Sequence, residues 1–115
     1  MISKKISREE DVRTGVEGGC GTISMDKLNS AVIRPSNVRK YAHAKLEPGA
    51  VVGYHTHYGE SETFYILSGK GLYDDNGTER EVSAGDVTYT SDGQGHSLKN
   101  IGDTTLEFML LIVVD

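Results

Sequence analysis

The sequence has a single cysteine, two prolines and no long hydrophobic run. Cys20 cannot form an internal disulfide bond, which favours a protein of the reducing cytoplasm. The longest apolar run, Met109–Val114, is too short to cross a bilayer. The charged start of the chain, Met1–Lys5, is not followed by the apolar core of a signal peptide. We therefore expect a cytoplasmic protein without membrane contacts.

Positive charge is also scarce, with 12 lysines and arginines against 17 aspartates and glutamates, a net charge of −5. The basic residues are scattered and form no stripe that would bind phosphates, which argues against a nucleic-acid partner. The length of 115 residues suits one domain. A chain of this length can bury a core without disulfides or a structural metal.

Because prolines are few, the 14 glycines supply most of the turns. From residue 38 onward, β-branched and aromatic segments are separated by turn residues at intervals of about 8–12 residues, a spacing typical of β-sandwiches and β-barrels. We therefore predict an all-β fold. The expected strands are 38–46, 51–57, 63–67, 72–73, 78–82, 87–90, 96–100 and 105–113.

Two short connections carry hairpin signals. Asn76-Gly77, between two strand-like segments, predicts a tight two-residue turn. Gly102-Asp103 predicts a second hairpin, which joins segments 96–100 and 105–113.

The first 37 residues are read as an N-terminal arm, and residues 38–115 as the barrel. Ser7, followed three residues later by Glu10, predicts one helical turn. The glycine-rich segment 15–21 predicts a flexible loop. Segments 22–25 and 31–33 are expected to be short strands that extend a sheet, either in this chain or in a partner.

Three histidines and one glutamate form the most informative pattern. His55 and His57 lie two residues apart in a predicted strand, so both imidazoles point to the same face. If Glu62 begins the neighbouring antiparallel strand, its carboxylate approaches the same point. His96 begins a later strand after a glycine-rich turn. Three imidazoles and one carboxylate suit Zn, Fe, Mn, Co or Ni.

The spacing of these residues resembles the two motifs of the cupin superfamily. Ser91 stands where the family usually has proline. The resemblance covers residues 38–114. The matching residues are Gly49, His55, His57, Glu62 and Gly69 in the first motif, and Gly85, Gly93, His96 and Asn100 in the second.

The resemblance implies a double-stranded β-helix, also called a jelly-roll cupin barrel. It implies that His55, His57, Glu62 and His96 bind one divalent transition metal per chain (Mn, Fe, Ni, Co or Zn), and that Asn100 holds backbone near the end of the barrel. It also implies a homodimer in which the N-terminal arm can be exchanged between subunits.

Glu60 and Tyr65 are the candidate catalytic residues. By parity Glu60 shares the face of Glu62, so it is an alternate ligand, a base, or a solvated loop residue. Tyr65, like Tyr54 and Tyr89, either lines a pocket or packs in the sheet. Four further residues have two interpretations each: His43 is an outward or an interface residue, Gln94 a donor at the rim or a turn residue, and Arg34 or Arg39 a carboxylate anchor or a surface residue.

Two classes of function remain open. The first is a metal-dependent oxygenase, decarboxylase or isomerase that acts on a small carboxylate or sugar-like substrate. The second is a non-catalytic, metal-dependent module that binds or senses a small ligand. The metal distinguishes them in part, because a four-coordinate site with four protein ligands is closed, whereas a six-coordinate ion keeps two positions open.

Overall fold

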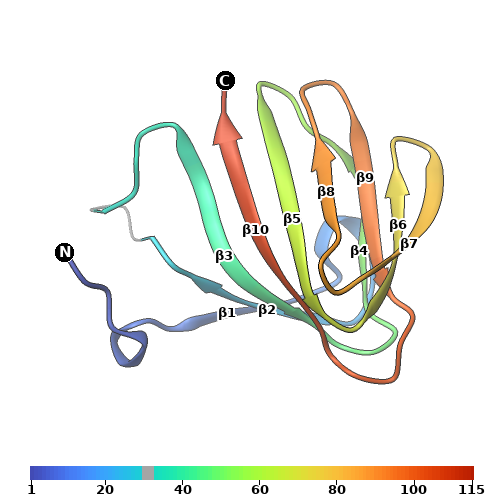
Figure 1. Ribbon diagram of the computed structural model, residues 1–115, viewed down its shortest axis with the longest axis horizontal. Helices are drawn as coiled ribbons and strands as arrows, with labels where there is room; N and C mark the ends of the chain where they lie inside the picture. Colours follow the sequence, from blue (N-terminus) through green and yellow to red (C-terminus); the bar gives the residue numbers. More distant parts are fainter. Residues whose placement is uncertain (30–32) are drawn as a thin grey trace.

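The computed structural model describes residues 1–29 and 33–115, which form two facing antiparallel sheets (Figure 1). In the described residues no helix is long and apolar enough to cross a membrane. The six-stranded sheet has the order β1 (Glu10–Thr14), β2 (Thr22–Lys27), β3 (Val38–Leu46), β10 (Leu106–Val114), β5 (Glu60–Ser68) and β8 (Val87–Thr90). The four-stranded sheet has the order β4 (Val51–Thr56), β9 (Gly95–Asn100), β6 (Lys70–Asp75) and β7 (Thr78–Ser83).

From β3 onward the chain passes repeatedly from one sheet to the other. Strands β3, β5, β8 and β10 belong to the larger sheet, whereas β4, β6, β7 and β9 belong to the smaller one. This alternation is that of a jelly-roll barrel and confirms the expected all-β class. The core lies between the sheets, where inward apolar side chains alternate with outward polar ones. On β3 and β10 the buried members include Ala42, Ala44, Leu46, Leu106, Phe108, Leu110 and Ile112.

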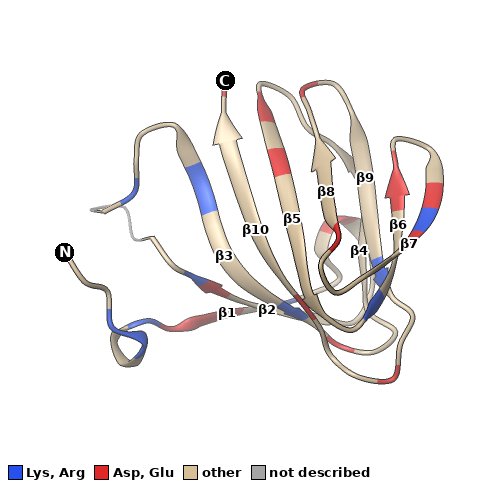
Figure 2. Ribbon diagram, in the orientation of Figure 1, with Lys and Arg blue, Asp and Glu red and all other residues tan. Residues whose placement is uncertain are grey.

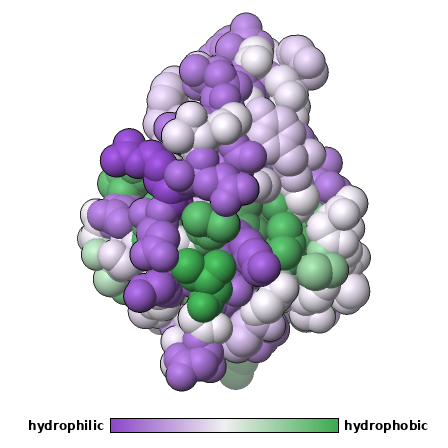
Figure 3. Space-filling model, turned by 90° about the vertical axis from the view of Figure 1, so that its right-hand side faces the viewer, coloured by the Kyte–Doolittle hydropathy of each residue, from purple (hydrophilic) through white to green (hydrophobic). Residues whose placement is uncertain are grey.

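The outer faces of the two sheets differ. Strand β7 exposes nearly all its residues, and the space-filling view of this side has only a small apolar patch bordered by hydrophilic residues (Figure 3). The outer face of the larger sheet instead exposes large side chains on three strands, namely Tyr41, Tyr65, Val87 and Tyr89.

The hairpin predicted at Asn76-Gly77 joins β6 and β7. Asp75 pairs with Thr78, so the loop has two residues. Both have positive φ angles, 49° for Asn76 and 103° for Gly77, as a type I′ turn requires. The prediction was specific because asparagine and glycine tolerate this left-handed backbone.

The second predicted hairpin, at Gly102-Asp103, is wrong. Strand β9 pairs with β4 and β6, whereas β10 pairs with β3 and β5, so this connection crosses between the sheets. The Asn100 side chain organises the crossing: its Nδ2 donates to the carbonyls of Leu46 and Thr104, and its Oδ1 accepts from the Gly102 backbone N–H. The position of Asn100 is therefore the one that the resemblance implies.

The N-terminal segment differs from the prediction in two places. The helical turn expected at residues 7–10 is wrong, because a short 3-10 helix, η1 (Lys5–Ser7), ends at Ser7 and Glu10 already begins β1. The Ser7 hydroxyl bonds back to the Lys4 carbonyl and caps nothing that follows. The expected strand at 22–25 is β2, which pairs with β3 of this chain. The strand expected at 31–33 lies mostly outside the described residues.

The glycine-rich segment 15–21, expected to be a flexible loop, contains a second 3-10 turn, η2 (Val16–Gly18), that packs on β4. Two glycines allow this contact. A Cβ on Gly19 would lie 1.9 Å from the Val51 carbonyl oxygen, and one on Gly53 would lie 2.0 Å from that of Glu17. The backbones are therefore too close for any side chain at either glycine. This contact fixes the N-terminal segment against the strand that carries His55.

Candidate metal centre

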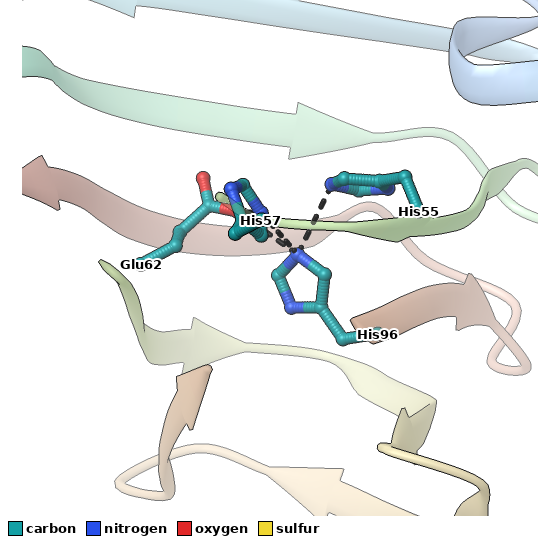
Figure 4. Close-up of side chains that lie close together, drawn as sticks. All are labelled: His55, His57, Glu62 and His96. Carbon is teal, nitrogen blue, oxygen red and sulfur yellow. Dashed lines mark hydrogen bonds and ion pairs between the residues drawn. The ribbon is translucent and has the colours of Figure 1, made fainter. Parts of the chain in front are cut away.

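The four predicted ligands converge between the two sheets (Figure 4). His55 on β4 lies directly opposite His96 on the paired strand β9, and His57 follows the end of β4. Glu62 comes from β5, which belongs to the other sheet. Glu62 therefore does not begin a strand beside β4, as the sequence suggested, and its carboxylate reaches the histidines across the interior.

The candidate ligand atoms form a compact group, with all four within 4.8 Å of one another. The Nε2 atom of His96 lies 3.1 Å from that of His55 and 3.1 Å from that of His57. The Glu62 Oε1 atom lies 3.0 Å from His96 Nε2 and 3.2 Å from His57 Nε2. His57, Glu62 and His96 are buried, and His55 is partly exposed.

Each imidazole is oriented through its other nitrogen. His55 Nδ1 donates to the Gly53 carbonyl oxygen at 2.8 Å, and His57 Nδ1 donates to the Glu60 carboxylate at 2.8 Å. Since both partners can only accept, the proton of each neutral ring lies on Nδ1 and the lone pair on Nε2 points inward.

The third imidazole contacts hydroxyl groups. His96 Nδ1 lies 2.8 Å from the Tyr73 hydroxyl and 2.9 Å from the Thr90 hydroxyl, which bond each other at 2.6 Å. A hydroxyl both donates and accepts, so this pair can accept an Nδ1 proton and leave Nε2 free. Tyr73 and Thr90 are buried polar residues that the sequence analysis did not identify. No local pattern distinguishes them from ordinary strand residues.

The charged forms of these side chains are strongly coupled. Burial opposes ionisation of Glu62, but hydrogen bonds with His57 and His96 lower its pKa to about 2. The hydrogen bond with Glu62 raises the pKa of His57, whereas burial lowers the pKa of His55. A carboxylate that stays ionised inside the protein requires a compensating positive charge.

These observations fit a bound divalent cation. With Nδ1 protonated on the three rings, the interior presents three imidazole lone pairs and a carboxylate, all acceptors that face one another. Buried acceptors without donors are costly, and a cation at their centre would satisfy all of them. Histidine nitrogens with one carboxylate match the preferences of divalent transition metals. The group His55, His57, Glu62 and His96 is thus able to hold a metal ion.

Glu60 is neither a solvated loop residue nor a member of the converging group. Its carboxylate accepts two hydrogen bonds from Arg39, at 2.6 and 2.9 Å, in addition to the one from His57. The Arg39 guanidinium holds the pKa of Glu60 below its usual range. Arg39 is therefore the carboxylate anchor that the sequence suggested, and the carboxylate is one of this chain's own.

Tyr65 does not reach the site. It follows Phe64 and precedes Ile66, both buried, so it points to the outer face of the sheet and is 46% exposed. Tyr54 and Tyr89 are also exposed. The expectation that Tyr65 is a catalytic candidate is therefore corrected, because strand alternation places its hydroxyl on the side away from the metal ligands.

His43 and Gln94 also lie away from the group. His43 pairs with Glu107 at 3.0 Å on the outer side of β3. The Gln94 Oε1 atom accepts from the backbone N–H and hydroxyl of Ser91, at 3.1 and 2.9 Å, so Gln94 is a turn residue. These bonds hold the turn before His96, although Ser91 replaces the usual proline.

The ligand group opens into a cavity of about 310 Å³. Apolar core residues form its walls, and three basic residues, Arg13, Arg39 and Lys40, line it together with the ligands. Lys40 was missed by the sequence analysis. Its signal is the alternation of β3, where Lys40 occupies the same phase as buried Ala42, Ala44 and Leu46. Burial and the nearby Arg39 lower the pKa of Lys40.

The fold and the ligand group agree with comparisons to known proteins. The family described as "Cupin domain" matches residues 42–114. An oxalate-binding protein of Thermotoga maritima is 42% identical over 101 residues, which cover 88% of this chain and 84% of that protein. Oxalate decarboxylase of Bacillus subtilis is 38% identical over 69 residues, which cover 56% of this chain but only 18% of that enzyme.

Two solved structures share the fold. A crystal structure described as a predicted oxalate decarboxylase from Thermotoga maritima has a TM-score of 0.93 and 37% identity, and covers all of both chains. The cupin domain of Schizosaccharomyces pombe Cnp3 has a TM-score of 0.75 at 17% identity, covering 91% of this chain and 69% of that one, and so supports the fold alone. From the match of its sequence, its two sheets and its His/Glu group, this chain belongs to the cupin family.

Proposed function

We propose that this protein binds small dicarboxylates of the oxalate type through a divalent metal ion held by His55, His57, Glu62 and His96. One observation carries the proposal: four acceptor side chains converge at the base of a cavity that three basic residues also line. A bound divalent ion supplies a Lewis-acidic centre that attracts a carboxylate ligand.

The charges of the chain favour an anionic ligand. Three neutral imidazoles and one carboxylate leave a divalent ion with a net charge of about +1. Arg13, Arg39 and Lys40 add positive potential around the same cavity. Low-dielectric walls focus such a potential and concentrate small anions. The name of the Thermotoga maritima relative, an oxalate-binding protein, supports oxalate as the first ligand to test.

Binding is favoured over catalysis because the chain lacks a free proton carrier among the candidates. Acid–base catalysis requires a group that exchanges a proton within reach of the substrate. Glu60 lines the cavity, but Arg39 and His57 occupy its carboxylate and Arg39 keeps its pKa low. Tyr65 lies on the outer face. Neither residue is therefore in a position to donate a proton.

Calorimetric titration of oxalate into metal-loaded and metal-stripped protein tests the proposal. The protein is purified without a chelating tag, and its metal is identified by elemental analysis. We expect saturable binding that is lost on stripping, restored by the same metal, and absent in His57→Ala. Equal binding to stripped protein, or none to loaded protein, would contradict the proposal. Release of CO₂ and formate from oxalate would instead identify a decarboxylase.

A further inference from the structure

The three basic residues that line the cavity differ in their partners. Arg39 binds the Glu60 carboxylate, and Arg13 pairs with Asp11 at 3.0 Å. Lys40 has no carboxylate within ion-pair distance among residues 1–29 and 33–115. Its charge is therefore the one of the three that no acidic side chain of the described chain neutralises.

Lys40 occupies the inward face of β3. Val38, Lys40 and Ala42 share one side of the strand, and Lys40 is half-buried. Two pairings place it relative to the ligand group: Lys40 is opposite Ile112 on β10, and Ile112 is opposite Glu62 on β5. Lys40 and Glu62 thus lie in one row, on the same face, with a single strand between them.

This row sets the separation between the lysine and the ligand group. Two strand spacings put the backbones of Lys40 and Glu62 about 10 Å apart. Figure 2 shows the basic part of β3 across β10 from the acidic part of β5. The flexible four-carbon stem of lysine carries its ammonium over part of that distance. The remaining gap is of the size of a small molecule.

Partial burial without a partner makes this ammonium group an anion receptor. Burial and Arg39 destabilise its charged form, which is why its pKa is lowered. An anion placed between Lys40 and the ligand group would relieve both effects, since it would pair with the ammonium and replace lost hydration. A surface lysine would gain little from such a pair.

We propose that Lys40 binds the second carboxylate of a dianionic ligand whose first carboxylate is held at the His/Glu group, and that it thereby selects dicarboxylates over monocarboxylates. The inference rests on the proposed function, to which it adds a specificity determinant on the opposite wall of the cavity. Lysine suits the role because its ammonium offers three donors on a mobile stem and adapts to ligands of slightly different length.

The test compares Lys40→Met with wild type by calorimetry of the metal-loaded proteins. Oxalate is the dianionic probe, and oxamate, in which an amide replaces one carboxylate, is the monoanionic probe. We expect Lys40→Met to weaken oxalate binding at least about tenfold, the value of a lost charge-assisted hydrogen bond, and to change oxamate binding much less. Metal content stays that of wild type, because Lys40 is not a ligand.

Lys45→Met is the matched control, because Lys45 lies on the same strand but on its outer face, 4.0 Å from Glu10. It should bind both probes as wild type does. If wild type binds oxalate and Lys40→Met binds it equally well, or loses oxalate and oxamate to the same degree, the role of Lys40 is overturned. If wild type binds neither probe, the proposed function itself fails. The two failures are therefore distinguishable.

Discussion

His55 and His96 lie directly opposite each other on the paired strands β4 and β9, with their Nε2 atoms 3.1 Å apart. The pairing brings together two residues that are 41 positions apart in the sequence. It also leaves both Nε2 atoms facing the carboxylate of the opposite sheet. The histidine pair is thus the fixed part of the ligand group.

Removing one of these histidines should abolish metal binding. His55 is the least buried ligand, so His55→Ala should disturb the fold least while removing an imidazole. We expect elemental analysis to give about one ion per chain for wild type and little for this variant. His43→Ala is the control, because it removes the fourth histidine of the chain from the outer face. Full metal content in His55→Ala would refute the assignment of this ligand.

Glu60→Gln should weaken metal binding without removing a ligand. The Glu60 carboxylate accepts from His57 Nδ1 and so directs Nε2 inward. Loss of such a partner usually costs 10–100-fold in metal affinity, so we expect a change of about that size in competition titrations.

The chain contains a natural control for this variant, since Glu107 pairs with His43 on the outer face at a similar distance, 3.0 Å. Glu107→Gln should bind metal as wild type does. Equal affinities in the two variants would argue that Glu60 has no orienting role.

The metal-free protein should lose stability in acid through Glu62. Burial opposes its ionisation, but hydrogen bonds with His57 and His96 lower its pKa from 4.5 to about 2 on folding. Because the folded pKa is the lower one, Glu62 stabilises the fold above about pH 4.5, and this contribution is lost as pH falls towards 2.

Denaturant unfolding of metal-free wild type and Glu62→Gln between pH 7 and pH 2 checks this expectation. The stability advantage of wild type should shrink across that window. A constant difference between the two proteins at all pH values would show that ionised Glu62 does not contribute.

Gly53→Ala should detach the N-terminal segment from β4. The new Cβ would meet the Glu17 carbonyl oxygen at 2.0 Å, so η2 or the strand must move. We expect a loss of about 1–3 kcal/mol in the free energy of unfolding, and weaker metal binding because the Gly53 carbonyl orients His55. Gly102→Ala is the control, since its new Cβ would meet atoms only at 3.5 Å and beyond. Similar stabilities for both variants would contradict the close packing.

The outer face of the larger sheet should form a homodimer contact. Tyr65 pairs with Val87 across β5 and β8, and both are exposed. We propose that a second copy covers these side chains, so light scattering after gel filtration should give about twice the chain mass of 12.5 kDa. Tyr65→Glu should shift the mass towards the monomer, whereas Tyr58→Glu, in an exposed loop, should not. A monomeric wild type would refute the contact.

The sequence by itself determined the residue types of the ligand group and much of the strand pattern. Spacing alone identified His55, His57, Glu62 and His96, because each follows a glycine-marked turn at a fixed offset. Strand alternation identified β3 and β8 with their observed bounds, since the side-chain period of a strand is a local property.

Tertiary structure decided which strands are neighbours and therefore what each side chain meets. The period of a strand says which residues share a face but not which sheet the strand joins, so Gly102-Asp103 was taken as a hairpin and Glu62 was placed beside β4. Only the packing of the two sheets shows that Glu62 reaches the histidines from the opposite side, that Arg39 occupies Glu60, and that Lys40 faces the cavity. These contacts join residues far apart in the chain, and no local pattern encodes them.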